Sequence, residues 1–476
     1  MSCTTKETRG GSQASCDDTE NKVDTSAGVG AGAGAGTGAG RTRAPQPDVS
    51  PADAAYNARF TTVCSKTPPS IAVVASYTQF DNLAHGPRGC EATYSMRSYE
   101  LDPRTGRLTL LTIATDKVMN PAFLRFHPTK NLVYGCTESV LENGQLVVWA
   151  LDPSTGALTR RGSSDAGGTS TCYVTIDSLG RHVLLVNYWD ATIVVQRLGD
   201  DGMPGETVTT FDPKGGQGMH VDATKRVNHS RNDKEAQAQR QLDPHSHAVV
   251  LSPCGRIAYI PDLGMDVIRQ LLYDPKTGSL AAVGSIRSGS RGLSLGPRYL
   301  HFHDRLPVCY VVNELASEVA VFRYSQDAVD RVVAAAGADG EASPPTLALV
   351  QVIRTVPAAF PLHMNTCGRI AVHESGRYVM CSNRGHDSVA VFRILHEHGG
   401  KLQAVSFQHT YGYTPRHFQF DPSGQWMVAA NQDSDEIGVF EFHIATGELT
   451  FTGFKYAVPS PNFVCCVQPH RCATGK

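Results

Sequence analysis

The chain has 476 residues, of which 41% are hydrophobic and 18% charged, and its formal net charge is −2. Such a length and composition predict a globular body with a large core, built as several domains or as one large repeat array. The near-neutral charge does not favour a nucleic-acid or anionic-membrane surface. No apolar run reaches the roughly 18 residues of a transmembrane helix, so neither nucleic acid nor membrane is an expected partner.

Residues 1–66 differ in composition from the rest of the chain. They are polar, contain the run AGVGAGAGAGTGAG from Ala27 to Gly40, and end in a Pro-rich passage. Such a segment has too few large apolar side chains to offset the entropy lost on ordering. We therefore expect a disordered tail at residues 1–66, followed by one folded domain at residues 67–470.

The cellular compartment is predicted from two features of the sequence. No charged segment followed by an apolar core is present at the N-terminus, which is the pattern of a secretory signal. The 13 cysteines are an odd number and include no CxxC pair. Both features favour reduced thiols in a cytoplasmic protein.

From residue 67 onward, short apolar segments alternate with turns. The octets LDPRTGRL at Leu101, LDPSTGAL at Leu151 and YDPKTGSL at Tyr273 share one pattern, and the first two begin 50 residues apart. Asp-Pro starts such a turn, and glycine takes the positive φ near its end. A period near 50 residues with four strands per unit is typical of a β-propeller.

Seven such units can be counted. Six have a complete first strand, near the residues Phe123, Tyr173, Ala248, Tyr299, Arg369 and His417. The seventh is split: the segments at Ser70 and Tyr94 supply later strands, and the segment at Pro461 supplies the first. Pairing the two chain ends closes the ring and removes exposed sheet edges. The predicted fold class is therefore an all-β, seven-bladed propeller.

Two spacings between units are longer than the period. A polar insert covers about 212–241, and an Ala/Gly-rich insert covers about 326–346. We expect both to be surface loops.

One position of the repeat changes its chemistry from unit to unit. The segments VVNELASEVAVF at Val311, CSNRGHDSVAVF at Cys381 and AANQDSDEIGVF at Ala429 share a frame, and looser copies occur at Val186 and Ile260. When the copies are aligned on the β-branched residue that opens the following strand, the fifth residue before it is Tyr188, Asp262, Glu314, Arg384 or Gln432. A structural repeat with a variable position of this kind indicates a functional site.

A second set of residues stands at the start of the first strands. It comprises Phe123, Cys172, His247, Arg298, Gly368 and Arg416. Because the first two strands of a unit form an antiparallel hairpin, both sets lie at the same end of each blade. One mouth of the central channel is thus expected to hold the following residues: His247, Arg298, Glu314, Arg384, Arg416 and Asp262. His245, in the segment DPHSH, is either a second pocket group or a turn residue.

These residue types suit a small anionic substrate. Arginine forks bind phosphate or carboxylate and can stabilise an oxyanion, and a histidine can take a proton from water. Structural roles remain open: Arg298 and Glu314 could form an ion pair within one unit, and His247 could be a buried structural residue. The His-x-His spacing has no matching set of carboxylates or cysteines, so we expect neither a metal nor a cofactor.

Four long segments resemble the seven-bladed propeller lactonases, a family that includes propeller-type 6-phosphogluconolactonases and fungal carboxymuconate lactonizing enzymes. They begin at Arg240, Leu295, Gly368 and Thr414, and the resemblance covers about residues 68–470. The family's site has a histidine that opens a first strand, and an arginine in Gly-Pro-Arg. It also has a glutamate in Asn-Glu and an arginine in Asn-Arg-Gly. The resemblance places these four on His247, Arg298, Glu314 and Arg384.

The resemblance implies a lactonase with 6-phosphogluconolactone as the leading substrate, acting in the pentose phosphate pathway of carbohydrate metabolism. In that interpretation, Arg298 and Arg384 hold the anion and polarise the carbonyl, and His247 takes a proton from water. Glu314 orients His247 or an arginine. The expected substrate-binding residues are His245, Arg416 and Asp262.

Two alternatives remain open. One is a cycloisomerase that acts on a carboxylated muconate, which needs the same anion clamp and proton-transfer group. The other is a non-enzymatic propeller that binds a protein or an anion. The sequence predicts no particular oligomeric state.

Overall fold

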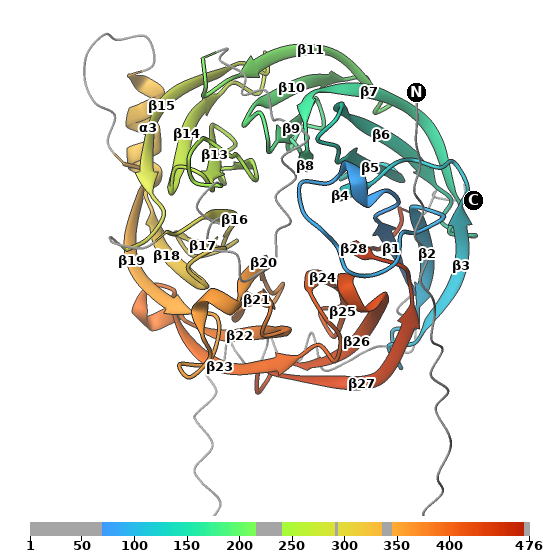
Figure 1. Cartoon of the computed structure of the whole chain (residues 1–476). Helices are drawn as coiled ribbons and strands as arrows, with labels where there is room; N and C mark the ends of the chain where they lie inside the picture. The colour runs from blue at the N-terminus through green and yellow to red at the C-terminus, as the bar shows by residue number, and fades with distance from the viewer. Residues whose placement is uncertain (1–68, 216–239, 291–293, 336–344, 471–476) are drawn as a thin grey trace, which may run out of the picture. The chain divides into compact units, whose positions relative to one another are not determined.

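The structure, a computed structural model, describes residues 69–215, 240–290, 294–335 and 345–470. The predicted tail at residues 1–66, most of the predicted insert at 212–241 and part of the insert at 326–346 lie outside these ranges. The described chain forms seven four-stranded antiparallel sheets arranged in a ring, as Figure 1 shows. The predicted seven-bladed propeller is therefore confirmed.

The blades are numbered here in chain order, each with its strands from the channel outward. Blade 1 comprises β4 (Pro121–Phe126), β5 (Leu132–Thr137), β6 (Asn143–Leu151) and β7 (Leu158–Thr169). Blade 2 comprises β8 (Thr171–Ile176), β9 (His182–Asn187), β10 (Ile193–Leu198) and β11 (Pro204–Phe211). Blade 3 comprises β12 (Val250–Leu251), β13 (Ile257–Asp262), β14 (Val267–Tyr273) and β15 (Leu280–Arg287).

Blades 4 to 6 repeat this plan. Blade 4 comprises β16 (Pro297–Phe302), β17 (Val308–Asn313), β18 (Glu318–Tyr324) and β19 (Leu347–Arg354). Blade 5 comprises β20 (Thr366–Val372), β21 (Tyr378–Arg384), β22 (Ser388–Leu395) and β23 (Lys401–His409). Blade 6 comprises β24 (Pro415–Phe420), β25 (Trp426–Asn431), β26 (Glu436–His443) and β27 (Glu448–Ala457).

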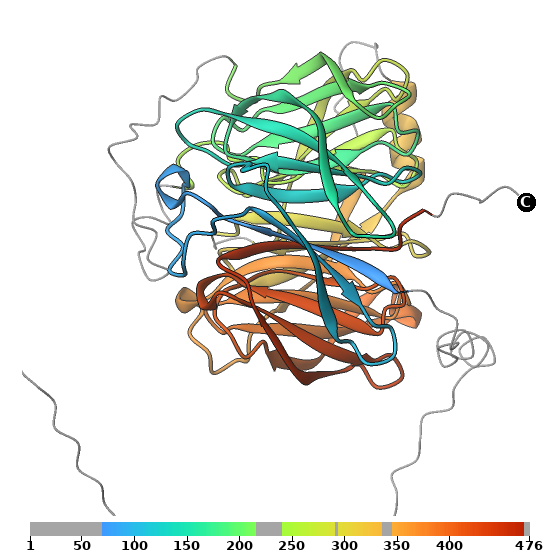
Figure 2. The ribbon, with the colours of Figure 1, turned by 90° about the vertical axis from the view of Figure 1, so that its right-hand side faces the viewer.

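Blade 7 is built from both ends of the described chain. It comprises β28 (Pro461–Val467), β1 (Ser70–Ser76), β2 (Met96–Leu101) and β3 (Leu108–Ala114). Strands β28 and β1 pair antiparallel, with Ile71 opposite Val467, and they run side by side in Figure 2. The predicted closure of the ring by the two chain ends is confirmed.

Side chains are buried in the second strand of a blade and become more exposed toward the fourth. Strands β5, β9, β13, β17 and β25 are buried at every residue. The outer strand β11 has no buried residue at all. A strand that is covered by a neighbouring blade on each face has an almost continuous apolar sequence. The chain therefore shows short apolar segments without helical periodicity. The core therefore lies between the blades.

The repeated octets form the turn between the third and fourth strands of a blade. Gly106 and Gly156 both have φ of +70°, as the turn pattern predicts. A side chain at Gly106 would also meet the ring of Trp426, at 2.4 Å from its nearest atom. The indole Nε1 of Trp426 donates to the carbonyl of Pro103 in the same turn, at 2.9 Å. The turn of blade 7 thus fastens that blade to blade 6.

The predicted surface loop at 326–346 is wrong over its first part, where the helix α3 (Gln326–Ala334) forms. Ser325 caps this helix by accepting the backbone N–H of Ala328 at 3.2 Å. Val329 and Val332 are buried in a cluster with Phe322 of blade 4. Their spacing puts them on one helix face, so an apolar stripe was present in a segment whose Ala/Gly content suggested a loop.

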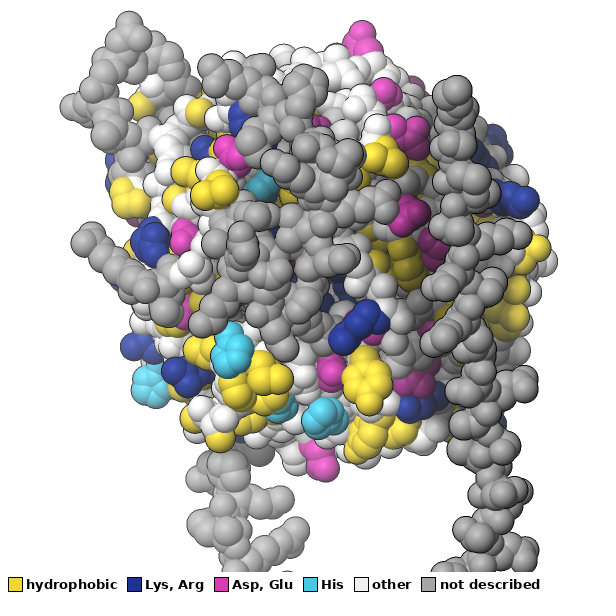
Figure 3. Space-filling model, viewed as in Figure 1, with side chains coloured by type: hydrophobic (Ala, Val, Ile, Leu, Met, Phe, Trp, Pro, Cys, Tyr) yellow, Lys and Arg dark blue, Asp and Glu magenta, His cyan; other side chains and the backbone are white. Residues whose placement is uncertain are grey.

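Two features of the described surface bear on function. Figure 3 shows acidic, basic and hydrophobic side chains interspersed over one face of the molecule. Within the ranges that the structure describes, no helix is long and apolar enough to cross a membrane.

Candidate active site

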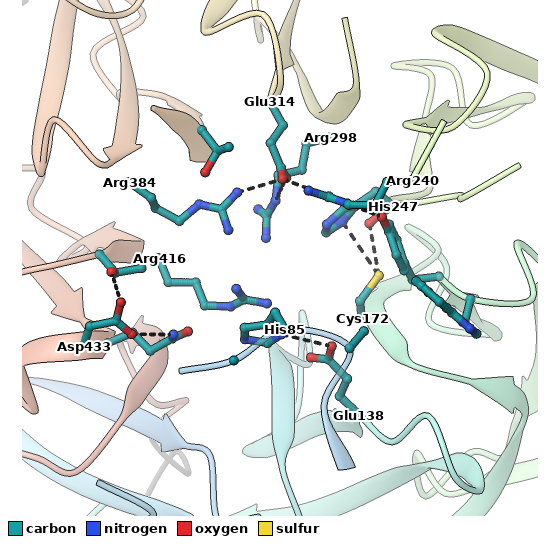
Figure 4. A pocket seen from close by; sticks show the side chains of 17 residues that line it. His85, Glu138, Cys172, Arg240, His247, Arg298, Glu314, Arg384, Arg416 and Asp433 are labelled. Atoms are coloured by element: carbon teal, nitrogen blue, oxygen red, sulfur yellow. Dashed lines mark hydrogen bonds and ion pairs between the residues drawn. The ribbon is translucent and has the colours of Figure 1, made fainter. Parts of the chain in front are cut away.

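A charged pocket lies at one mouth of the central channel, with a volume of about 130 Å³. All seven blades contribute to its lining, and Figure 4 shows the side chains that surround it. Its lining includes the side chains of His85, Glu138, Cys172, Tyr188, Arg240, His247, Arg298, Glu314, Arg384 and Arg416.

The variable position of the repeat is fixed by backbone hydrogen bonds. The residue after the second strand donates its N–H to a carbonyl just before the first strand, as Glu314 does to Gly296 at 2.7 Å. Glu138 donates to Asn120 in the same way, at 2.9 Å. By these bonds and the strand register, the seven equivalent residues are Tyr77, Glu138, Tyr188, Leu263, Glu314, Arg384 and Gln432. Five of them line the charged pocket, and Tyr77 and Leu263 do not.

A β-bulge places the second set of residues at the same mouth. In blades 1, 2, 4 and 6 the register shifts at the start of the first strand, which releases one residue: Ala122, Cys172, Arg298 or Arg416. Bulges of this kind redirect a side chain next to an active site. In blade 1 the released residue is Ala122 instead of Phe123, so the expected position was one residue too late there.

The structure brings together five of the predicted site residues. His247, Arg298, Glu314, Arg384 and Arg416 all line the charged pocket. The convergence of two sets of residues on one mouth, expected from the hairpin geometry, is therefore present.

Asp262 does not line the pocket, which corrects its expected position. It is fully buried, and its carboxylate accepts Nε and Nη2 of Arg269 at 2.8 and 2.7 Å. Strand pairing sets Asp262 opposite Val267, just as Asn313 is set opposite Glu318 in blade 4. The sequence alignment on Val267 therefore placed the variable position of this blade one residue too early. In a strand, a shift of one residue turns the side chain to the other face of the sheet.

His245 also lies outside the pocket lining. Its ring stacks on Tyr188 and Trp189, with centroids 4.8 and 5.0 Å apart. Its Nδ1 lies 3.2 Å from the carbonyl oxygen of Tyr188. Burial lowers the pKa of His245 to about 3. His245 therefore supports two residues that line the pocket and does not reach it.

Glu314 is the centre of the charged cluster. Its Oε1 lies 2.9 Å from Arg240 Nη2, and its Oε2 lies 2.9 Å from Arg298 Nε and 3.0 Å from Arg384 Nη2. Burial raises the pKa of Glu314, but Arg240, Arg384 and Arg298 outweigh it and hold the pKa well below its usual value. Glu314 is therefore ionised and holds three guanidinium groups in place.

Two of these arginines are also fixed by the first strand of blade 5. Arg298 Nη1 donates to the carbonyl of Gly368 at 2.9 Å, and Arg384 Nη2 donates to that of Cys367 at 2.5 Å. The Nε of Arg298 meets Glu314 at ion-pair distance but without hydrogen-bond geometry. Burial lowers the pKa of Arg384 to about 10, so it stays charged at neutral pH. Both forks are rigid before any substrate arrives.

Arg416 has a different environment. It makes no ion pair with any carboxylate of the described residues, and its guanidinium lies over the ring of Tyr77, 5.4 Å from the centroid. Four arginines thus surround the pocket, and three of them share the single negative charge of Glu314. Uncompensated buried charge is costly, so an anionic ligand fits this arrangement.

The sequence interpretation missed Glu138, a second carboxylate in the pocket. It is 5% exposed and accepts the hydroxyl of Tyr77 at 2.9 Å, while His85 Nδ1 lies 3.7 Å from its other oxygen. Burial raises its pKa, and Arg416 only partly offsets this. Glu138 occupies the variable position of blade 1. It went unnoticed because Thr137 stands where blades 2, 4, 5 and 6 have asparagine.

Arg240 was missed for another reason, since it lies within the predicted surface insert at 212–241. Its Nε donates to the hydroxyl of Tyr188 at 3.0 Å, and Nη2 pairs with Glu314. The end of that insert therefore belongs to the site. No repeat marks this position, so the sequence carried no periodic signal for it.

His247 is a titratable base that lines the same pocket as the charged cluster. Its ring packs edge-on to Tyr188 and Tyr299, and its Nδ1 lies 3.7 Å from the sulfur of Cys172. Burial and the charge of Arg298 lower its pKa well below the usual value. The imidazole is therefore neutral at pH 7. Among the residues with described positions, no cluster of three or more His, Cys, Asp or Glu side chains could hold a metal.

Comparison with known proteins agrees with this fold. The family model "Lactonase, 7-bladed beta-propeller" matches residues 71–468. The 6-phosphogluconolactonase of Bacillus subtilis is 29% identical over 373 residues, which cover 78% of this chain and 93% of that protein. The 6-phosphogluconolactonase of Formosa agariphila is 24% identical, covering 74% and 89%.

Solved structures show the same architecture. A protein from Bacteroides uniformis superposes with a TM-score of 0.66 at 25% identity, covering 84% of this chain and all of that one. The periplasmic gluconolactonase of Pseudomonas aeruginosa gives 0.66 at 22% identity, covering 84% and 99%. By the match over most of its length, the chain belongs to the seven-bladed β-propeller lactonase family.

Proposed function

We propose that the protein hydrolyses a small anionic sugar lactone, with 6-phosphogluconolactone as its substrate. The observation that carries this proposal is the convergence of four arginines on one pocket whose central carboxylate is already shared by three of them. Relatives that cover most of the folded chain are named 6-phosphogluconolactonases, which supports the choice of substrate.

The anionic group of the substrate is held by arginines. Arg416 makes no ion pair with a carboxylate among the described residues, and Arg384 enters the pocket from the same side in Figure 4. Arginine forks bind phosphate in bidentate fashion. Because Arg384 and Arg298 are already held by Glu314 and by carbonyls of blade 5, little side-chain entropy is lost on binding.

Hydrolysis requires a proton acceptor for the attacking water, and His247 takes this role. Its neutral imidazole accepts a proton as the water oxygen bonds to the lactone carbonyl carbon. The carbonyl oxygen becomes an oxyanion, which Arg298 stabilises. When the ring C–O bond breaks, the departing oxygen takes up a proton and the carbonyl carbon becomes a carboxylic acid, which then ionises.

The two pocket carboxylates have opposite environments, which separates their roles. Glu314 is held ionised by three arginines, and so it positions those arginines instead of exchanging protons. Glu138 lies on the opposite side of the pocket in Figure 4, and burial raises its pKa. When their environments drive the pKa values of two carboxyl groups apart, the group with the raised pKa is suited to act as the acid. We assign Glu138 as the acid that protonates the departing ring oxygen.

The test is hydrolysis of freshly generated 6-phosphogluconolactone, corrected for its spontaneous opening. Wild type, Arg384→Ala and Arg104→Ala are assayed in parallel. Arg104 has 75% of its side chain exposed and makes its ion pair with Asp102 in a turn of blade 7, so it serves as the matched control. We expect Arg384→Ala to lose roughly 10²–10³-fold in kcat/KM, as for removal of one charge-stabilising donor, and Arg104→Ala to match wild type.

Two outcomes contradict the proposal. Wild-type hydrolysis no faster than the spontaneous reaction excludes this substrate, and product analysis with a carboxylated muconate then tests the cycloisomerase. Full activity in Arg384→Ala excludes the charged pocket as the reaction site.

A further inference from the structure

A second cavity opens into the channel at the end away from the charged pocket. Its volume is about 350 Å³, and Arg125, Tyr173, Tyr299, His301 and Arg369 line it. These residues lie in the middle and at the far end of the first strands, whereas the charged pocket uses the starts of those strands. The hairpin after β12 also contributes to this second cavity.

An aromatic layer separates the two cavities. The rings of Tyr173 and Phe463 lie 4.3 and 4.5 Å from that of Phe123, and Tyr299 lies 5.6 Å from Tyr173, between centroids. Phe123 is fully buried. The second cavity is therefore distinct from the pocket assigned to the lactone.

The second cavity holds two arginines without a carboxylate. Neither Arg125 nor Arg369 makes an ion pair with an acidic side chain in the described part of the chain. Arg125 is held by the carbonyl of Val174, 3.3 Å from its Nε, and by the hydroxyl of Tyr173, 3.4 Å from its Nη2. The Nε of Arg369 is buried and has no hydrogen-bond partner among the described residues.

A buried guanidinium nitrogen without a partner is unusual in a folded protein. Such groups cost free energy unless an ion or water satisfies them. Two neighbouring cations that lack a carboxylate also repel each other. Burial is the main cause that lowers the pKa of Arg369, and the charge of Arg125 contributes to lowering it. A bound anion would relieve both costs.

His301 adds a hydrogen-bond donor to this cavity. Its Nδ1 accepts the backbone N–H of Val372 at 3.0 Å. Burial, with Arg369 and Arg125, lowers its pKa to about 3, so the ring is neutral and carries its proton on Nε2. Arginine forks together with a neutral N–H donor match the acceptor oxygens of an oxyanion.

From this arrangement, we propose that the cavity around Arg125, His301 and Arg369 is a second anion site, which binds a small oxyanion of the phosphate class. The site is independent of the proposed lactone hydrolysis, because the aromatic layer lies between them.

The test is calorimetric titration of the full chain with inorganic phosphate. Wild type is compared with Arg369→Gln, which removes one of the two arginine charges of the second cavity, and with Arg416→Gln, which removes a charge from the pocket of the lactone. We expect Arg369→Gln to bind one phosphate fewer per chain than wild type while retaining full lactone hydrolysis. Arg416→Gln is expected to keep the site that Arg369→Gln loses. A parallel titration with 6-phosphogluconate shows whether the second cavity also accepts a phosphate ester.

Equal phosphate stoichiometry and affinity in wild type and Arg369→Gln overturn the proposal, whatever the outcome of the lactone assay. Circular dichroism and thermal unfolding establish that each variant is folded. If Arg369→Gln does not fold, Arg125→Gln takes its place, with Arg125→Lys as the charge-retaining control. Unchanged phosphate binding in the folded Arg125→Gln variant then overturns the proposal equally.

Discussion

At the scale of single residues, the site depends on how two glutamates are surrounded. Glu314 meets three arginines and remains ionised, whereas Glu138 meets a tyrosine hydroxyl and a histidine and has a raised pKa. Both occupy the same position of the repeat, in blades 4 and 1. The same residue type in equivalent backbone geometry therefore has a different protonation behaviour, because the neighbouring blades supply different charges.

The role of Glu138 predicts a pH dependence. A general acid acts in its protonated form, so kcat is expected to fall as pH rises through the raised pKa of Glu138. His247 adds no limb at neutral pH, because its lowered pKa leaves it unprotonated there. Glu138→Gln should reduce kcat by roughly 10²-fold and remove this limb from the pH profile of lactone hydrolysis. A variant whose profile still falls over the same pH range would contradict the assignment.

At the scale of elements, the hairpins between the first and second strands join neighbouring blades. His303 and His373 stand at the same hairpin position in blades 4 and 5. In each, Nδ1 accepts a backbone N–H of its own turn. Each Nε2 donates to a glycine carbonyl in the hairpin of the next blade, at 2.8 Å: His303 to Gly376 and His373 to Gly424. One side chain thus shapes its turn and holds the adjacent blade.

His373→Asn tests this link. Asparagine can still accept a turn N–H, but it is too short to reach Gly424. Loss of the hydrogen bond and of buried volume should lower the free energy of unfolding by about 3 kcal/mol at pH 7, as measured by urea denaturation.

The difference between wild type and His373→Asn should depend on pH. Burial lowers the pKa of His373 to about 4, and an unfolded histidine titrates near 6.5. The unfolded chain therefore binds more protons between these values, so the contribution of His373 is complete above pH 6.5 and is lost as pH falls toward 4. At pH 5 the difference should be about 2 kcal/mol smaller than at pH 7. An equal difference at both pH values would show that His373 does not titrate in this way.

At the scale of the whole molecule, ring closure makes the pocket possible. The charged pocket takes residues from all seven blades, and blade 7 exists only because β28 pairs with β1. Without that pairing, β1 has an exposed edge, and blades 6 and 1 lose the neighbour that they pack against.

Truncation tests the closure. A chain that ends at Ser460 lacks β28, whereas a chain that ends at His470 keeps every described strand and is the control. We expect the shorter chain to lose cooperative thermal unfolding and to be digested rapidly in limited proteolysis, and the control to behave like the full chain. Cooperative unfolding of the shorter chain at the wild-type temperature would contradict this role of β28.

How far the sequence predicted the site depends on whether the signal was periodic. His247, Arg298, Glu314, Arg384 and Arg416 occupy repeat positions, and all five line the pocket. Asp262 was misplaced because two β-branched residues, Val267 and Ile268, both fit the start of the strand, and only the pairing with β13 distinguishes them. Since side chains alternate across a strand, that one-residue error reversed the direction of the side chain.

By itself, the sequence determined the repeat, the number of blades, the closing strand and the arginines at repeat positions. These follow from local rules, because turn residues and apolar runs recur along the chain whatever it contacts elsewhere. Only the tertiary structure decided that Arg240 reaches Glu314, that Glu138 faces the same pocket, and that Arg125 and Arg369 share a second cavity. Those groupings join residues of different blades, and their distances are set by how the ring closes.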